Sequence, residues 1–186
     1  MRLFLSVTLS FLISTQSVLA CACCVDKGER FARVEPLDAY VQEQFNALGN
    51  LGPIRVFTTV CGLDCVSGID DPKEVYDGAV TVRGGLFRVD LGTSGILEVP
   101  IGAAYDRFGV DLDPMSDGPA DQIYSEFRFF SQLGASGDFA PADGARADLV
   151  FSGRTNACWL AGDLTHWTLD VSGPGVTFRL FGALSP

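Results

Sequence analysis

Six cysteines are the residues of this sequence with the widest choice of chemistry. They are Cys21, Cys23, Cys24, Cys61, Cys65 and Cys158. The first three crowd into the string "SVLACACC", and the next two close the string "CGLDC". Thiols so spaced can carry a lipid anchor, pair as disulfides or bind a soft metal ion. The surrounding sequence has to decide among these three.

The segment in front of the cluster indicates export. Arg2 supplies a positive charge, residues 3–14 form an apolar run, and Ala20 is the kind of small residue behind which signal peptidases cut. The run is shorter than the roughly 20 residues that cross a bilayer. We therefore expect a signal peptide over 1–20 and a single periplasmic or extracellular domain over 21–186. Cleavage after Ala22 also fits the A-x-A pattern.

In an oxidising compartment, an even number of cysteines predicts disulfides. Cys61 and Cys65 lie near enough in sequence to close a tight loop, and we expect Cys23 or Cys24 to pair with Cys158. Chain entropy gives the short loop about 2 kcal/mol and the long loop about 5 kcal/mol of stabilisation. The long bridge would fasten the N-terminus to the segment before the last predicted hairpin.

Two alternatives stay open for the N-terminal cluster. The string Val-Leu-Ala-Cys at 18–21 resembles a lipobox, which would put a lipid anchor on Cys21 and make the protein a membrane-anchored lipoprotein. A metal site formed by Cys21, Cys23 and Cys24 is the weaker alternative, because structural zinc needs four well-spaced ligands and His166 is the only histidine. A redox role for "CGLDC" is disfavoured, since thioredoxin-type spacing is C-x-x-C.

His166 is the one histidine that could act in acid–base catalysis. Asp163 and Asp170 flank it in "DLTHWTLD". Asp170 would project from the same strand face but two pairs away, beyond hydrogen-bond reach. The nucleophile elbow G-x-S-x-G does not occur in the sequence. We expect a structural histidine beside Trp167, no catalytic residue, and a protein that is not an enzyme.

An acidic string at 111–121, "DLDPMSDGPAD", raises a calcium hypothesis. Its carboxylates belong to Asp111, Asp113, Asp117 and Asp121. The string fails the EF-hand register because Met115 stands at the third ligand position. We expect a solvated loop and no metal there.

The charge balance excludes one class of partner. The chain has 13 basic and 23 acidic residues, a net charge of −10. Nucleic acid is excluded because phosphate binding needs a basic stripe, and none stands out in the sequence.

Eight segments favour β-strands by alternation or by β-branched content. They are 54–60, 79–83, 86–91, 96–101, 123–133, 147–152, 165–171 and 176–181. Gly84-Gly85 and the turn 92–95 should join three of them into a meander. The last hairpin, which turns at 172–175, carries apolar residues on both faces of its second strand. That pattern predicts a place inside a closed sheet.

One helix is predicted by an apolar stripe with helical spacing. The stripe is formed by Leu37, Val41, Phe45 and Leu48, with Tyr40 beside them. Pro36 fits its first turn and Gly49 its end. The fold class is therefore all-β, an antiparallel barrel or two-sheet sandwich of about eight strands with one short N-terminal helix. We prefer the barrel, whose mouth could hold a small ligand.

Two strings carry a resemblance. "CACC" at the start of the predicted mature chain and "GRTNACWLAGDLTHWTLDVSGP" near the end resemble exported bacterial proteins without an assigned activity. Within the second string, "THWTLDVSGP" is the more specific part, whereas "CGLDC" lies outside the resemblance. The resemblance implies bacterial export and transfers no catalytic or binding residue.

These observations favour an exported, non-catalytic envelope β-domain, without a cofactor, that binds a small ligand or an envelope protein. The alternative is thiol chemistry, in which the N-terminal cysteine cluster handles metal or exchanges disulfides.

Non-reducing peptide mass spectrometry of the exported protein tests the cysteine assignments. We expect a Cys61–Cys65 bridge and a second bridge from Cys23 or Cys24 to Cys158, because an oxidising compartment favours both. A lipid mass on Cys21, or free or metal-bearing thiols in the cluster, would contradict this and make the N-terminus the functional site.

Overall fold

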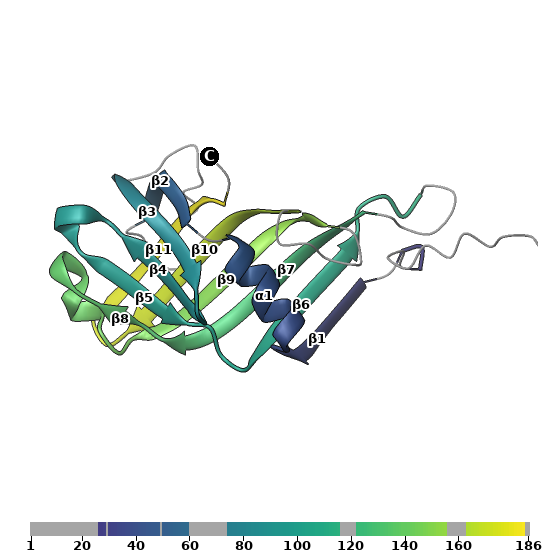
Figure 1. Ribbon diagram of the computed structural model, residues 1–186, viewed down its shortest axis with the longest axis horizontal. Coiled ribbons are helices and arrows are strands. Elements are labelled where there is room, and N and C mark those ends of the chain that lie inside the picture. Colours follow the sequence, from purple (N-terminus) through teal and green to yellow (C-terminus); the bar gives the residue numbers. More distant parts are fainter. Residues whose placement is uncertain are drawn as a thin grey trace, which may run out of the picture.

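The computed structural model describes residues 26–28, 30–48, 50–59, 74–115, 122–155 and 163–184, and strands dominate them (Figure 1). The strands are β1 (Arg30–Pro36), β2 (Asn50–Thr59), β3 (Glu74–Arg83), β4 (Leu86–Asp90), β5 (Ile96–Pro100), β6 (Ala104–Asp111), β7 (Ile123–Gln132), β8 (Gly134–Ala135), β9 (Arg146–Thr155), β10 (Leu164–Gly173) and β11 (Val176–Ala183). The helical elements are α1 (Ala39–Leu48) and two 3₁₀ segments, η1 (Gly92–Ser94) and η2 (Gly137–Ala142).

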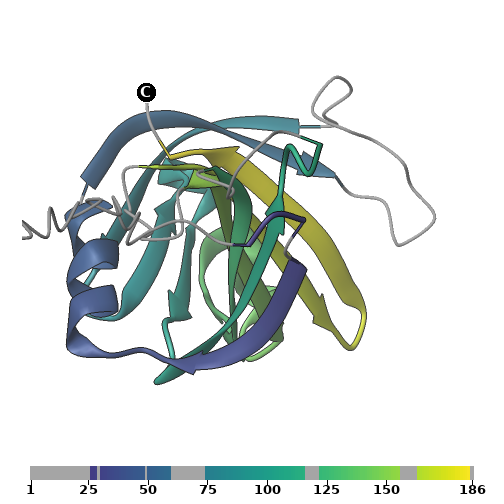
Figure 2. The ribbon, with the colours of Figure 1, turned by 90° about the vertical axis from the view of Figure 1, so that its right-hand side faces the viewer.

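The strands form two packed antiparallel layers. Their order is β1-β6-β7-β9-β10-β11-β2-β3-β4-β5-β8. The first six strands of this order, from β1 through β6, β7, β9 and β10 to β11, make a six-stranded layer. The next four, β2, β3, β4 and β5, make a four-stranded layer with the two-residue β8 at its edge. Only three residue pairs, from Arg179–Thr59 to Phe181–Phe57, join β11 to β2. Figure 2 shows the two layers wrapped around a common interior.

The predicted fold class is confirmed, and of the two architectures the sandwich is the one observed. Within the described residues the ladder does not close into a barrel, because β1 and β8 are its two ends. The preference for a barrel is therefore wrong. The last hairpin does lie inside the ladder, between β9 and β2, but the sheet around it is open.

The eight predicted strands correspond to β2–β5, β7 and β9–β11, and the described residues add β1, β6 and β8. The meander forms as expected: Gly84 and Gly85 have φ angles of 61° and 75°, and Arg83 pairs with Leu86 across this two-residue loop. Positive φ at both loop positions gives the twist that a tight hairpin needs.

Aromatic side chains fill the interior between the layers. Phe87 on β4 reaches across to the other layer, with its ring centroid 5.6 Å from Phe151 on β9 and 5.2 Å from Trp167 on β10. All three are fully buried. Within the described residues, aromatic rings thus fill the space between the two layers.

The helix contributes one ring to the same core. The Phe45 centroid lies 5.2 Å from those of Phe129 and Phe151, and Phe45 is fully buried. Leu37, Val41 and Leu48 pack against the core and are partly buried, as the apolar stripe predicts. Tyr40 does not belong to that stripe: it is 54% exposed.

The start of the helix differs from its prediction. Pro36 is the last residue of β1, and α1 begins at Ala39. Asp38 caps the helix, because its Oδ1 accepts a hydrogen bond of 2.9 Å from the Val41 amide. Gly49, the predicted end, lies outside the described residues. Within those residues, no helix has the length and apolar character needed to cross a membrane.

Replacing Phe45 tests whether α1 belongs to the core. Phe45→Ala should lower the free energy of unfolding by about 3–5 kcal/mol, because it leaves a cavity between aromatic rings. Tyr40→Ala, on the exposed side of the same helix, should change it by no more than about 0.5 kcal/mol. Urea unfolding followed by circular dichroism measures both, and equal losses would show that the helix does not anchor through Phe45.

Candidate functional site

The cysteine assignments concern residues outside the described part of the chain. Cys21, Cys23 and Cys24, the "CGLDC" pair and Cys158 all lie there, as does the predicted signal peptide. Disulfides, lipid anchor and thiol-bound metal therefore remain predictions.

The acidic string begins inside the fold rather than in solvent. Asp111 ends β6 and is 7% exposed. Its Oδ2 accepts a 2.8 Å hydrogen bond from the Gly28 amide and its Oδ1 one of 2.9 Å from the Asp113 amide. The expectation of a solvated loop is thus wrong for Asp111, which fastens two backbone segments. Asp117 and Asp121 lie outside the described residues, within which no three potential metal ligands come together.

His166 forms no dyad with Asp163 or Asp170, the two carboxylates that flank it in sequence. It is exposed on the outer face of β10, and its Nδ1 lies 2.9 Å from the Thr165 hydroxyl. Asp170 is four residues further along the strand, roughly 13 Å away, and is ion-paired with Arg179. Asp163 is partly exposed just before β10. The neighbouring Trp167 points to the opposite face, into the core.

A groove on the outer face of the six-stranded layer brings together other side chains. We call it the outer groove; it has a volume of about 330 Å³. Its lining residues are Tyr124, Glu126, Arg128 and Phe130 on β7, Asp148, Val150 and Ser152 on β9, Thr168 and Asp170 on β10, and Arg179 on β11. Alternation places them there, because their strand neighbours on the other face fill the core.

Strand register arranges the lining into transverse rows. One row runs from Phe130 to Asp148, Asp170 and Arg179, each paired with the next across neighbouring strands. Asp148 and Asp170 are therefore directly opposite each other. Like charges in that position destabilise a sheet, so the groove contains a local electrostatic cost.

Arginines offset this cost by pairing with each carboxylate. Arg179 donates to both oxygens of Asp170, with Nη2 2.9 Å from Oδ2. Arg146, at the rim, donates to both oxygens of Asp148 at 2.9 and 3.2 Å. Further along β7, Arg128 Nε donates to Glu126 at 2.8 Å. The charges of the outer groove are thus paired one to one.

Two aromatic residues mark the ends of the groove along β7. The Tyr124 hydroxyl donates a 2.8 Å hydrogen bond to Glu126, and burial, together with that hydrogen bond, raises the pKa of Tyr124. Phe130 is 48% exposed, with the Arg146 guanidinium 5.4 Å from its ring centroid. A strand advances about 3.3 Å per residue, so the two positions are roughly 20 Å apart.

A second group of polar side chains lies on the inner face of β1 and β6, at the border of the core, where Tyr105 is buried. The Tyr105 hydroxyl donates to Glu35 at 2.9 Å, and Glu35 also pairs with Arg33 at 3.5 Å and Arg107 at 3.7 Å. Both guanidiniums lie over the ring of Phe31, at 4.5 and 5.4 Å from its centroid. We call these five residues the edge cluster; it binds the edge strand to its neighbour.

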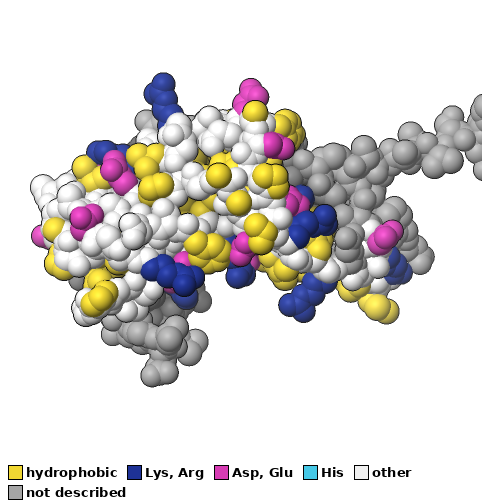
Figure 3. All heavy atoms as spheres, turned by 90° about the horizontal axis from the view of Figure 1, so that it is seen from below, with side chains coloured by type: hydrophobic (Ala, Val, Ile, Leu, Met, Phe, Trp, Pro, Cys, Tyr) yellow, Lys and Arg dark blue, Asp and Glu magenta, His cyan; other side chains and the backbone are white. Residues whose placement is uncertain are grey.

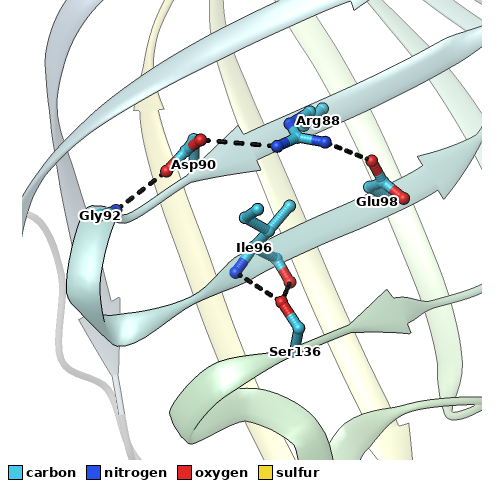
Figure 4. Close-up of polar contacts among 6 residues, drawn as sticks. All are labelled: Arg88, Asp90, Gly92, Ile96, Glu98 and Ser136. Carbon is cyan, nitrogen blue, oxygen red and sulfur yellow. Dashed lines mark hydrogen bonds and ion pairs between the residues drawn. The ribbon is translucent and has the colours of Figure 1, made fainter.

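The outer face of the four-stranded layer has its own ion pairs, shown in Figure 4. Arg88 lies between Glu98, at 2.8 Å, and Asp90, at 3.5 Å. Beside them, the Ser136 hydroxyl accepts a hydrogen bond of 3.2 Å from the Ile96 amide, which fastens the segment after β8 to β5. Arg88 resembles Arg179 in its chemistry but lies on the opposite side of the molecule, away from the outer groove.

Comparison with known proteins gives no relative. The chain matches no protein family, no curated protein and no solved structure.

The outer groove was not among the predicted sites, although part of its signal is in the sequence. The alternation over 123–133 assigns Tyr124, Glu126 and Arg128 to the outer face of one strand. Their neighbours on β9, β10 and β11 depend on strand order and register, which a single sequence does not contain.

High pH should weaken the edge cluster through Tyr105. Burial and the adjacent Glu35 raise the pKa of Tyr105 above its usual value. The unfolded chain therefore loses the phenolic proton first, so stability is intact below pH about 10 and falls as the pH rises further.

Comparing wild type with Tyr105→Phe measures this effect. At pH about 7 the variant should lose about 1.5 kcal/mol of unfolding free energy with the hydrogen bond to Glu35. This deficit should shrink at pH about 11. At that pH the unfolded wild type loses the Tyr105 proton while the folded wild type keeps it, so the wild type loses stability that Tyr105→Phe does not lose. Tyr40→Phe serves as the exposed control, and a deficit independent of pH would contradict the assignment.

Proposed function

We propose that the protein is an exported, non-catalytic binding domain that holds its ligand in the outer groove. The observation that carries this proposal is the position of the groove. Aromatic rings occupy the interior of the sandwich, whereas Tyr124, Phe130 and several hydrogen-bonding side chains line one hollow on its surface. Ligand sites are typically concave and combine apolar surface with a few well-placed polar groups.

The polar groups of the groove support binding over catalysis. A general acid or base needs a proton-exchanging group free to face a substrate. Here Glu126, Asp148 and Asp170 each already accept hydrogen bonds from an arginine. His166 is not among the residues that line the groove. Export is supported by the signal-like sequence over 1–20.

A blocking substitution tests the binding site. Thr168 lies in the middle of the groove floor, opposite Val150. In ¹H–¹⁵N NMR spectra recorded against a library of small polar fragments, we expect shift changes in the amides of β9 and β10. Thr168→Trp should abolish them by filling the groove. Thr81→Trp, a half-buried threonine substitution on β3 in the other layer, should leave them in place.

Two results would overturn the proposal. One is fragment binding that maps elsewhere, or that persists in Thr168→Trp. The other is turnover of chromogenic ester or glycoside substrates that disappears in a folded His166→Ala or Asp163→Asn variant.

A further inference from the structure

We propose that the ligand of the outer groove is a neutral oligosaccharide, which lies along β7 between Tyr124 and Phe130. This inference rests on the proposed function and names the chemical class of its ligand. It follows from the charge, hydrogen-bonding capacity and length of the groove.

The charge of the groove favours a neutral ligand. Its carboxylates, Glu126, Asp148 and Asp170, are matched by Arg128, Arg146 and Arg179 in the ion pairs described above. The groove with its rim is therefore neutral, although the whole chain has a net charge of −10. A charged ligand would have to compete with one of these pairs and leave a partner uncompensated. A neutral ligand avoids that cost.

The distribution of charge on the wider surface also favours a neutral ligand. On the face in Figure 3, acidic and basic side chains are interspersed rather than gathered by sign.

The paired side chains still have hydrogen-bonding capacity. A carboxylate has about four acceptor positions and a guanidinium five N–H donors, and an ion pair uses about two of each. Donors and acceptors therefore lie side by side along the groove. A sugar hydroxyl, which both donates and accepts, can satisfy the two together. Ser152, which pairs with Glu126 in the ladder, and Thr168, which pairs with Val150, add hydroxyls to the groove.

The aromatic ends supply the apolar part of the site. A sugar ring has polar edges and C–H groups on its faces, so it can pack on an aromatic ring while its hydroxyls reach polar neighbours. Tyr124 lines one end of the groove, and the half-exposed Phe130 lines the other.

The length of the groove favours a chain of sugars over a single one. The two aromatic positions are six residue steps apart on β7, which places their Cα atoms roughly 20 Å apart. Across the strands, the floor from β7 to β11 spans three spacings, roughly 14 Å. Several sugar units are needed to contact both aromatic ends at once.

An oligosaccharide array tests the ligand class, with neutral glucans, xylans, mannans and galactans printed beside uronic-acid oligosaccharides. We expect binding to a neutral member. Isothermal titration calorimetry with its soluble forms should show affinity that increases from disaccharide to hexasaccharide. Raising NaCl from about 0.05 M to about 0.5 M should change Kd by no more than about twofold, because no net charge is neutralised.

Two matched pairs of variants locate the sugar. Arg179→Ala and Phe130→Ala should each raise Kd at least about tenfold, as expected for the loss of one hydrogen-bonding or packing partner. Arg88→Ala removes a similar ion-paired arginine on the opposite layer, and Tyr40→Ala removes another exposed aromatic side chain. Both controls should keep Kd within about twofold of wild type.

Three outcomes would overturn the inference. They are binding only to uronic-acid sugars with a steep salt dependence, neutral-sugar binding unaffected by both groove variants, and no binding on the array. In each case, the proposed binding function would still hold if fragments bind in the groove and Thr168→Trp abolishes that binding. If no fragment binds in the groove either, both the proposed function and the oligosaccharide inference fail.

Discussion

Ring packing between the two layers is the interaction on which the other elements depend. Phe87 comes from one layer, Phe151 and Trp167 from the other, and Phe45 from the helix, with centroids of contacting rings 5.2 to 5.6 Å apart. Because protein interiors are close-packed, such rings fix the spacing of the layers and hold α1 in place. The same packing fills the space between the two described layers with aromatic rings.

Where the core ends, the inner faces of the strands become polar. Phe31 still covers Gly109, where a Cβ atom would come within 2.4 Å of its ring, but Arg33, Glu35 and Arg107 follow in place of apolar residues. Charged side chains that point inward on an edge strand discourage pairing with other chains. The edge cluster therefore attaches β1 to β6 and, at this end of the described ladder, discourages pairing of β1 with another chain.

The same change of polarity explains which parts of the fold could be predicted from sequence. Strands over the core, such as β7, alternate cleanly, and the paired glycines at 84–85 specify a hairpin by their backbone freedom. β1 and β6 do not alternate, because Arg33, Glu35 and Arg107 occupy inner positions, and Asp111 resembles the start of an acidic loop although it is a buried tether. Pro36 suits a helix start as well as a strand end. Only the pairing of β1 with its neighbour in the sheet shows that Pro36 ends a strand and does not begin the helix.

The outer groove could not be predicted from sequence because its side chains come from several strands whose register a single sequence does not contain. Its ion pairs explain how it can be stable and still present hydrogen-bonding groups. Register places Asp148 opposite Asp170, an arrangement that costs stability unless each carboxylate has a cation of its own. Arg146, two residues along β9, pairs with Asp148, and Arg179, across on β11, pairs with Asp170. Exposed ion pairs of this kind contribute little net stability, because water competes for both partners. Under the proposal above, a ligand whose hydroxyls replace that water would gain hydrogen bonds from the pairs without having to separate them.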